Sequence, residues 1–204
     1  MPTEVAGLVL AGGESRRMGR DKAALELGGT NQLARTVALL QRHLPAVFVS
    51  VRESQQQDPL RARFAQIVDA PAFSPQELSG PIAGILGAFA AKPDHAWLVV
   101  ACDLPLLDDD AIAGLLAGRA ADRIATAYTS AFDQLPEPLC AIWEPPAAEA
   151  LRAHVAGGNL CPRKFLLRNG AHFLPERASV STNINTPAEL AALPLPGSFS
   201  QETP

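Results

Sequence analysis

Two glycines and a group of cationic side chains stand close together near the start of the chain. Gly12 and Gly13 are followed by four positively charged side chains, Arg16, Arg17, Arg20 and Lys22. Adjacent glycines permit positive φ angles and leave backbone N–H groups unobstructed, so several of them can converge on one anion. Arginine would then offer that anion a planar fork, and lysine a point charge. The segment therefore predicts a site for a polyanion such as a nucleoside triphosphate.

A carboxylate much later in the chain is the second candidate for chemistry. Asp103 follows the apolar segment 97–101, which predicts a buried strand, and open α/β sheets bind their ligands beyond the carboxyl ends of such strands. Mg²⁺ binds through one or two carboxylates plus substrate phosphates. Asp103 is thus the candidate metal ligand, while Lys22 and Arg17 would offset charge on the phosphates. The set suits nucleotidyl transfer, in which a nucleophile displaces pyrophosphate.

Direct inspection excludes several other functions. The loop lacks the G-x-x-x-x-G-K-[ST] and G-x-G-x-x-G patterns, and no G-x-S-x-G elbow surrounds Ser15. A net charge of −4 and a pI near 5.6 argue against a nucleic-acid partner. No segment approaches ~20 uninterrupted apolar residues, so no membrane association is expected. The three cysteines form no C-x-x-C pair, which favours a reduced, cytoplasmic protein in which Cys102 and Cys140 are small buried hydrophobes.

Strand and helix alternate along most of the chain, as needed to position these residues. Strands are predicted at 5–10, 46–51, 66–68, 97–101, 124–127, 138–143 and 171–174. Helices are predicted at 30–43, 58–64, 79–91, 111–116, 146–155 and 161–167, with a short one ending at 192. This order predicts an α/β fold, a three-layer α/β/α sandwich with a mostly parallel, Rossmann-like sheet. One domain would cover residues 1–193, with a disordered tail at 194–204 and a mobile loop at 70–78.

Five motifs, in this order and spacing, resemble those of the MobA-like nucleotidyltransferases, notably the molybdenum cofactor guanylyltransferases. They are residues 10–22 (LAGGxSxRMGxDK), 80–84 (GPIAG), 102–105 (CDLP), 138–141 (PLCA) and 183–190 (NINTPAEL). The resemblance spans roughly residues 4–192, and its first motif is long and specific. It implies a sheet of the nucleotide-diphospho-sugar transferase type and a Mg²⁺ cofactor. The LAGG start is similar to that of the guanine-using branch.

The resemblance also implies roles for individual residues. The nucleotide would be bound by Leu10, Ala11, Gly12, Gly13, Lys22, Ser50, Asp69 and Asp103, with Asp103 also holding the metal. Asn183 and Asn185 match a segment assigned to the pterin side of the acceptor. Arg163 and Lys164 are our own candidates for the acceptor's phosphate. Each role has a structural alternative: Asp69 could cap a turn, both asparagines could make turn hydrogen bonds, and the two cations could be an ordinary helix surface.

The implied reaction is transfer of GMP from GTP to the phosphate of molybdopterin, with release of pyrophosphate. GTP and molybdopterin would be the substrates, and transient contact with molybdoenzymes or other cofactor-biosynthesis proteins stays open. Ser50 stands where guanylyltransferases usually have asparagine, and Arg52 follows where a second asparagine is common. This departure leaves two alternatives of the same chemistry: cytidylyl transfer to molybdopterin, and nucleotidyl transfer to another acceptor such as a sugar phosphate. An alternative of another class is a non-catalytic carrier of nucleotide or cofactor.

Overall fold

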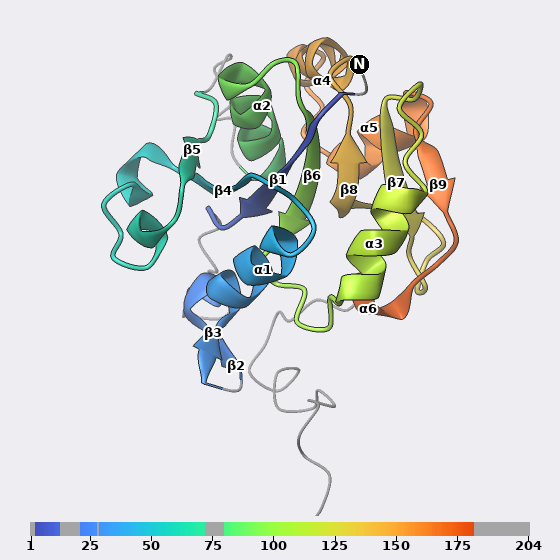
Figure 1. Cartoon of the computed structure of the whole chain (residues 1–204). Coiled ribbons are helices and arrows are strands. Elements are labelled where there is room, and N and C mark those ends of the chain that lie inside the picture. The colour runs from blue at the N-terminus through green and yellow to red at the C-terminus, as the bar shows by residue number, and fades with distance from the viewer. Residues whose placement is uncertain (1–2, 13–20, 28, 72–79, 182–204) are drawn as a thin grey trace, which may run out of the picture.

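A computed structural model describes residues 3–12, 21–27, 29–71 and 80–181 (Figure 1). Lys22 and Asp103 are positioned by a central sheet. It has seven strands in the order β5-β4-β1-β6-β8-β7-β9. Their bounds are β1 Val5–Leu10, β4 Val47–Val51, β5 Gln66–Val68, β6 Ala96–Ala101, β7 Ala125–Thr129, β8 Pro136–Trp143 and β9 His172–Leu174. Strand β8 is antiparallel to both of its neighbours, and the other pairings are parallel. The predicted mostly parallel sheet is therefore confirmed.

The order in which the chain visits the strands reverses between β5 and β6. From β1 the chain crosses through helix α1 (Gln32–Gln41) to β4 and on to β5, and it then returns to β6 on the opposite side of β1. At the carboxyl ends of β1 and β6, the connection that leaves β1 runs toward β4 on one side and the connection that leaves β6 runs toward β7 on the other. Open α/β sheets bind ligands in the crevice at such a switch point. The strand order alone thus directs attention to the segments that follow β1 and β6.

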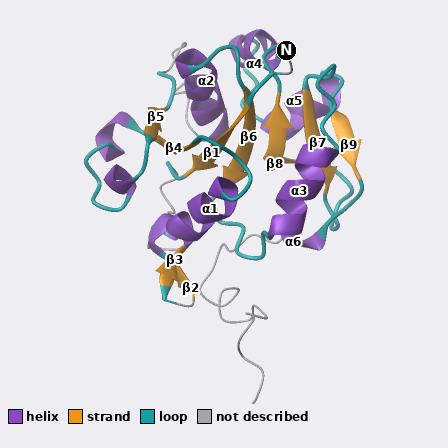
Figure 2. Cartoon of the chain, viewed as in Figure 1, coloured by secondary structure: helices purple, strands orange, loops and turns teal. Residues whose placement is uncertain are grey.

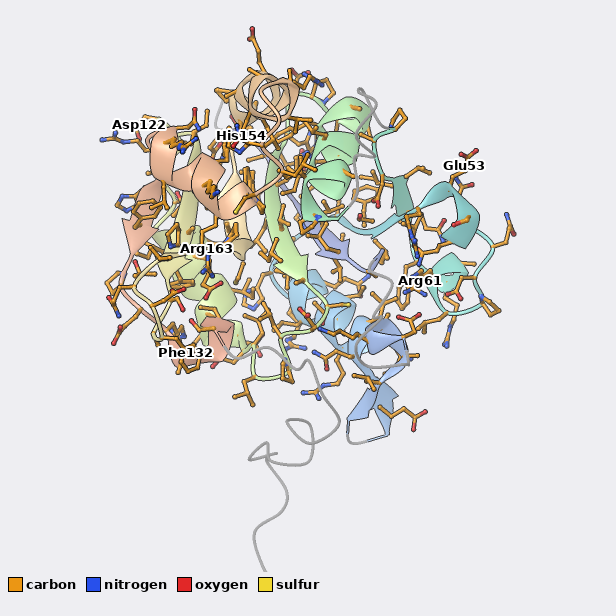
Figure 3. All side chains as sticks on the ribbon, turned by 180° about the vertical axis from the view of Figure 1, so that it is seen from behind. Glu53, Arg61, Asp122, Phe132, His154 and Arg163 are labelled. Atoms are coloured by element: carbon orange, nitrogen blue, oxygen red, sulfur yellow. The ribbon has the colours of Figure 1, made fainter. Side chains whose placement is uncertain are left out.

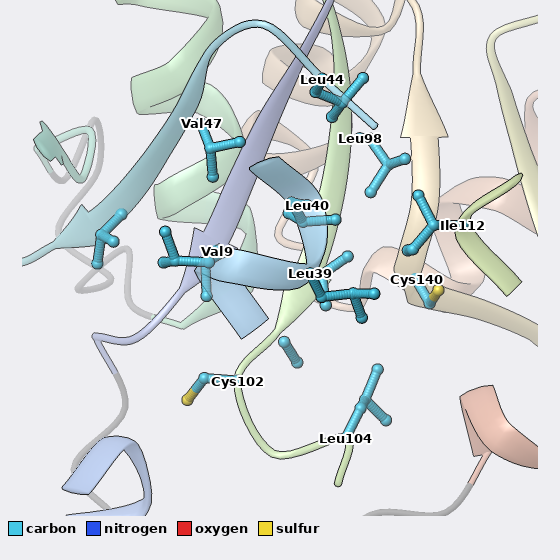
Figure 4. Packing of buried hydrophobic residues seen from close by; sticks show 14 of the residues in the cluster. Val9, Leu39, Leu40, Leu44, Val47, Leu98, Cys102, Leu104, Ile112 and Cys140 are labelled. Atoms are coloured by element: carbon cyan, nitrogen blue, oxygen red, sulfur yellow. The ribbon is translucent and has the colours of Figure 1, made fainter. Parts of the chain in front are cut away.

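Helices cover both faces of the sheet (Figures 1 and 2). One face carries α1, α3 (Asp109–Ala117) and the short α6 (Ala178–Ser181), which pack on the alternate strand residues Val9, Leu98 and Val100 (Figure 4). The other face carries α2 (Pro81–Ala91), α4 (Ala147–Ala156) and α5 (Pro162–Arg168). Since residues of β6 alternate between the two clusters, both of its faces are buried. The three-layer sandwich is as predicted.

The local differences from the sequence-based prediction have identifiable causes. The helix expected from residue 30 begins at Gln32, because Thr30–Asn31 (β3) pairs with Glu26–Leu27 (β2) and Asn31 caps the helix by accepting from the Ala34 amide at 2.8 Å. The helix expected at 58–64 is a single 3₁₀ turn, Arg61–Arg63. Two more 3₁₀ turns, Lys22–Ala24 and Glu53–Gln55, and helix α6 were not predicted.

Parts of several predictions lie outside the described residues. They concern most of the loop at 70–78, the helix ending at 192 and the tail at 194–204. Within the described ranges, no helix has both the length and the apolar character needed to cross a membrane.

Candidate functional site

Lys22 and Asp103 meet at the switch point of the sheet. The ends of β1 and β6 are joined by a hydrogen bond from the Cys102 amide to the Leu10 carbonyl, at 3.2 Å, and Asp103 follows directly. The segment 12–20, which begins with Gly12 and Gly13, is called the glycine loop below. Lys22 begins the 3₁₀ turn after it, and its Nζ lies 2.8 Å from Asp103 Oδ2. Their side chains are 18% and 22% exposed. The two groups are therefore held by the fold but remain accessible to a ligand.

The donor set around Asp103 fits a magnesium ion that is shared with a substrate. Among the residues that the structure describes, no three His, Cys, Asp or Glu side chains gather as a metal cage. Mg²⁺ does not need one, because it commonly binds one or two carboxylates and completes its shell with phosphate oxygens and water. Asp103 supplies a part-exposed carboxylate beside the cation Lys22. Such a site suits a metal that arrives with a nucleotide.

Asp69, Ser50 and Gly12 form a second group at the same edge of the sheet. The Asp69 amide donates to the Val51 carbonyl at 2.8 Å, and the buried Ser50 hydroxyl donates to Asp69 Oδ1. Burial raises the pKa of the Asp69 carboxyl, although the Ser50 hydrogen bond and the charge of Arg52 act in the opposite direction. A Cβ on Gly12 would lie 3.1 Å from Asp69 Oδ2. The glycine loop thus begins against this carboxylate.

The small residues of α2 are explained by close packing on the strand ends. A Cβ on Gly84 would lie 2.4 Å from Ser50 Oγ and 2.7 Å from Leu10 Cδ2. A Cβ on Gly87 would lie 2.4 Å from the carbonyl oxygen of Val68 at the end of β5. Real Cβ atoms do not approach other atoms so closely, so Gly87 is required by the backbone it meets, and a side chain at Gly84 would displace Ser50 and Leu10. These contacts favour helix packing over direct approach to a ligand, and they press α2 against Ser50.

Arg61 also contacts residues at this end of the sheet, although no sequence motif predicted a role for it. It lies in the 3₁₀ turn before β5 and is 1% exposed (Figure 3). Its guanidinium donates to the Ala11 carbonyl and to the carboxylates of Asp21 and Asp58. Burial alone would lower the pKa of Arg61, but the two carboxylates outweigh it and the net pKa is raised. A lone arginine in a polar segment carries no motif, so only the fold reveals these contacts.

The candidate acceptor residues lie at the same end of the sheet, the end at which β1 and β6 have their carboxyl ends and which is called the carboxyl edge below. Arg163 lies in α5 (Figure 3). It donates to Asp133 at 2.8 Å and to Glu137 at 3.3 Å. Glu137 belongs to β8, whose first residue pairs with Thr129 at the carboxyl end of β7. Arg163 therefore lies at the expected edge, but beside β7 and β8 rather than between β1 and β6. Lys164 is exposed on the same helix.

Other candidates lie outside the described residues or have purely structural surroundings. Gly13, Arg17, Asn183 and Asn185 are outside the described ranges, as are Arg16 and Arg20. Cys102 and Cys140 are buried, as expected of small hydrophobes, and burial raises the pKa of both thiols to about 12. Thiols of that kind are not nucleophiles at neutral pH.

Comparison with known proteins identifies the family. A family model described as the MobA-like NTP transferase domain matches residues 7–172. The chain belongs to this family. It is 34% identical over 188 residues to the "Molybdenum cofactor biosynthesis bifunctional protein" of a Synechocystis strain, a match that covers 92% of this chain and 53% of that protein. The chain thus spans about half the length of that relative.

Full-length relatives of similar size match as well. The "Molybdenum cofactor guanylyltransferase" of Cereibacter sphaeroides is 34% identical over 193 residues, covering 91% of this MobA-like chain and 93% of the relative. Among solved structures, molybdopterin-guanine dinucleotide biosynthesis protein A from Archaeoglobus fulgidus superposes with a TM-score of 0.71 at 26% identity, covering 91% of this chain and 95% of its own. Family and fold confirm the sequence-based predictions, and the chain is a nucleotidyltransferase.

Proposed function

We propose that this MobA-like protein transfers GMP from GTP to the phosphate of molybdopterin and releases pyrophosphate. The observation that carries the proposal is the contact of Lys22 with Asp103 at the switch point between β1 and β6. A cation and a carboxylate at this position suit a triphosphate and its divalent metal. The names of the similar proteins, a guanylyltransferase and a molybdopterin-guanine dinucleotide biosynthesis protein, support guanine and molybdopterin as the two halves of the product.

Nucleotide binding is assigned to the β1–β4–β5–β6 part of the edge. Backbone N–H groups of the loop that starts at Leu10, Ala11, Gly12 and Gly13 would bind phosphate oxygens, and Lys22 and Arg17 would offset their charge. Asp103 would hold Mg²⁺, which when bound supplies charge neutralisation at the phosphates. Asp69, oriented by Ser50, would accept hydrogen bonds from the nucleoside. The contacts of Ser50 with Asp69 and of Lys22 with Asp103 exist before the nucleotide arrives, which avoids the cost of arranging these four side chains during the reaction.

The acceptor is assigned to the β7–β8–α5 part of the edge and to Asn183 and Asn185. Arg163 and Lys164 would bind its phosphate, and an oxygen of that phosphate would attack the α-phosphorus. The new O–P bond forms as the bond from the α-phosphorus to the bridging oxygen breaks, so the electron pair leaves with pyrophosphate. A phosphate monoester is already anionic near neutral pH, because its second pKa is about 6. No strong general base is then required for the attack.

The proposal is tested by measuring binding and turnover of the full chain with each nucleotide. The protein is mixed with Mg²⁺, molybdopterin and either GTP, CTP, ATP or UTP, and pyrophosphate release is followed. Fastest release with GTP is expected, and omission of the divalent metal should abolish it. Fastest release with CTP, or with a sugar phosphate in place of molybdopterin, would contradict the proposed substrates. Binding of GTP without any pyrophosphate release would favour a carrier.

A further inference from the structure

Arg61 connects the two ends of the glycine loop. Its Nε and Nη2 donate to the carbonyl oxygen of Ala11, at 3.0 and 2.7 Å. Its Nη1 and Nη2 donate to the two carboxylate oxygens of Asp21, at 2.7 and 3.0 Å. Ala11 directly precedes the glycine pair and Asp21 directly precedes Lys22. One planar guanidinium therefore fixes the distance between the residue that opens the loop and the residue that closes it.

The geometry of these contacts is suited to holding a position. The pair to Asp21 is bidentate and the pair to Ala11 brings two donors to one carbonyl oxygen, so both constrain direction as well as distance. Arg61 is itself anchored, because its side chain is 2% exposed, and Asp58, three residues earlier in the same turn, accepts from its Nη1 at 3.1 Å. Transferring an arginine from water to the protein interior costs free energy. Here that cost is offset because the guanidinium N–H groups have hydrogen-bond acceptors. The arrangement specifies one relative placement of Ala11 and Asp21.

The cluster also adjoins the metal candidate. Lys22 follows Asp21 directly and its Nζ donates to Asp103 Oδ2 at 2.8 Å, while Asp21 accepts from Arg61 at 2.7 Å. Asp21 moreover caps the 3₁₀ turn that starts at Lys22, since its Oδ1 accepts from the Ala23 amide at 3.0 Å. The carboxylate that Arg61 holds is thus the one that sets the direction of the turn carrying Lys22.

We infer that Arg61 is a positioning residue for the nucleotide's phosphates: by joining Ala11 to Asp21 it holds Ala11 and the turn that carries Lys22 in the binding arrangement. This inference rests on the proposed function for the identity of the ligand. Arg61 acts through the loop, so its loss should weaken binding of the triphosphate more than binding of the nucleoside portion. A displacement of about 1 Å at a binding group can reduce efficiency by ~100-fold.

A second arginine, part-buried with its side chain 15% exposed, offers a matched control. Arg119 pairs with both carboxylate oxygens of Glu144, at 2.7 and 2.8 Å, and donates to the Thr3 carbonyl at 2.9 Å. It therefore makes the same kinds of contact as Arg61, a bidentate carboxylate pair and a backbone carbonyl. Its partners lie on the segment before β1 and just after β8, away from the glycine loop. Arg61→Met and Arg119→Met should both lower the melting temperature.

The first measurement compares affinity for GTP and GMP, by calorimetry in the presence of Mg²⁺. Arg61→Met should raise the Kd for GTP at least tenfold, about 1.4 kcal/mol, and raise the Kd for GMP by a smaller factor. Arg61→Lys should give an intermediate value, because a point charge cannot make both pairs of hydrogen bonds. Arg119→Met should leave the ratio of the two Kd values unchanged. Equal losses for GTP in Arg61→Met and Arg119→Met would overturn the inference.

Variants of the two carboxylates test the same contact without removing the arginine. Asp21→Asn should shift GTP affinity in the same direction as Arg61→Met, and the double variant should lose less than the sum of the two. Asp58→Asn should lower GTP affinity less than Asp21→Asn does, because the asparagine keeps an oxygen that can accept from Arg61 and Asp58 does not touch the loop ends. Fully additive losses in the double variant, or a loss in Asp58→Asn as large as that in Asp21→Asn, would contradict the assigned role.

A measurement without nucleotide separates this inference from the proposed function. Hydrogen exchange of the amides at 21–27 should speed up in Arg61→Met at a temperature where the protein is folded, and should be unchanged in Arg119→Met. If the protein proved to use another nucleotide, the exchange result would still test the role of Arg61. Unchanged exchange at 21–27 in Arg61→Met would exclude that role whatever the substrate.

Discussion

The carboxyl edge of the sheet consists of two halves that are built in different ways. The nucleotide half, at the ends of β1, β4, β5 and β6, has parallel strands, and its polar groups make buried contacts such as Ser50 with Asp69. The acceptor half, at the ends of β7 and β8, contains the reversed strand and an exposed turn at 130–135, where Phe132 is 76% exposed. Its charged contacts, such as Arg163 with Asp133, are open to solvent.

This difference shows what each half can do. In the nucleotide half the chain must cross the sheet between strands, and bonds such as that of Ser50 to Asp69 fix the described strand ends, which suits the proposed binding of phosphates. In the acceptor half a direct connection from β7 to β8 leaves its side chains in water. Exposed ion pairs contribute little to stability, so a ligand anion can replace a carboxylate at small cost. The fold thus combines a preorganised site with an exchangeable one.

The largest expected effect contrasts two carboxylates at the same edge, one in each half. Asp103→Asn should lower the rate of pyrophosphate release about 100- to 1,000-fold, because an amide is a poor Mg²⁺ ligand and the metal contributes several kcal/mol to the transition state. The fold should persist, since the Lys22–Asp103 contact is part-exposed. The rate is measured at saturating nucleotide, and circular dichroism checks the fold.

The matched change in the acceptor half is Glu137→Gln. Glu137 contacts Arg163 rather than the metal candidate, so this variant should retain the rate at saturating acceptor. Equal losses of rate in Asp103→Asn and Glu137→Gln would contradict the proposal that the two halves have different roles. Unchanged turnover in Asp103→Asn would remove Asp103 from the mechanism.

A smaller effect is expected from the exchangeable half. Replacing Arg163 and Lys164 together by Met should raise the KM for molybdopterin about tenfold, the effect of one lost hydrogen bond to a charged group. The Kd for GTP should stay as it is, because neither residue contacts the nucleotide half. Steady-state kinetics with varied acceptor, and calorimetry with GTP, give the two numbers. A change in GTP affinity without a change in the KM for molybdopterin would show that these cations act on the nucleotide, which would contradict their assignment to the acceptor.

The two halves also differ in how far the sequence could predict them. The apolar segments of β1 and β6 end in glycines or a carboxylate, and the carboxyl ends of parallel strands lie at the same end of a sheet. The sequence therefore allowed the prediction that Lys22 and Asp103 lie close together, as they do. Around β7 and β8, the direction of β8 is decided by pairing between distant segments. No local pattern specifies that direction.

Arg61 shows a second limit of prediction. Its importance comes from contacts with residues that are 50 and 40 positions away in the chain, and its own neighbourhood is an ordinary polar segment. Asp58 accepts from the Arg61 amide at 3.0 Å, but the helix predicted at 58–64 is one 3₁₀ turn whose N-cap residue is Leu60. A cap identifies where a turn begins, and tertiary contacts decide how long it continues.

A third prediction tests whether the nucleotide half gives up stability for binding. Burial raises the folded-state pKa of Asp69 above its unfolded value, so the folded protein binds the extra proton and loses stability as pH rises through that range. Asp69→Asn should therefore be more stable than wild type at pH 7, by about 1 kcal/mol at most. The gap should close below pH ~4, where the unfolded carboxyl is protonated too.

Denaturant titrations of wild type and Asp69→Asn between pH 3 and 8 provide this measurement. Nucleotide affinity should fall in the same variant, because an amide donates where the carboxylate only accepts. The acceptor-half control is Asp133→Asn: there the bond from the Leu135 amide, with the charge of Arg163, lowers the pKa, so the variant should be equal or less stable at pH 7. A stability gap for Asp69→Asn that widens on acidification would have the opposite sign and would contradict the cause assigned to the shift.

The smallest effect concerns thiol chemistry, which should distinguish the two halves without changing the fold. Cys102, beside Asp103, and Cys140 are buried with pKa values raised to about 12, whereas Cys161 precedes α5 and is partly exposed. Ellman's reagent at pH 8 should therefore titrate one thiol in the native protein and three after unfolding. Cys161→Ser should abolish the native signal, and GTP affinity should not change. Native labelling of Cys102 would mean that the nucleotide half opens to solvent, and the contrast between a fixed and an exchangeable half would then fail where it is expected to be strongest.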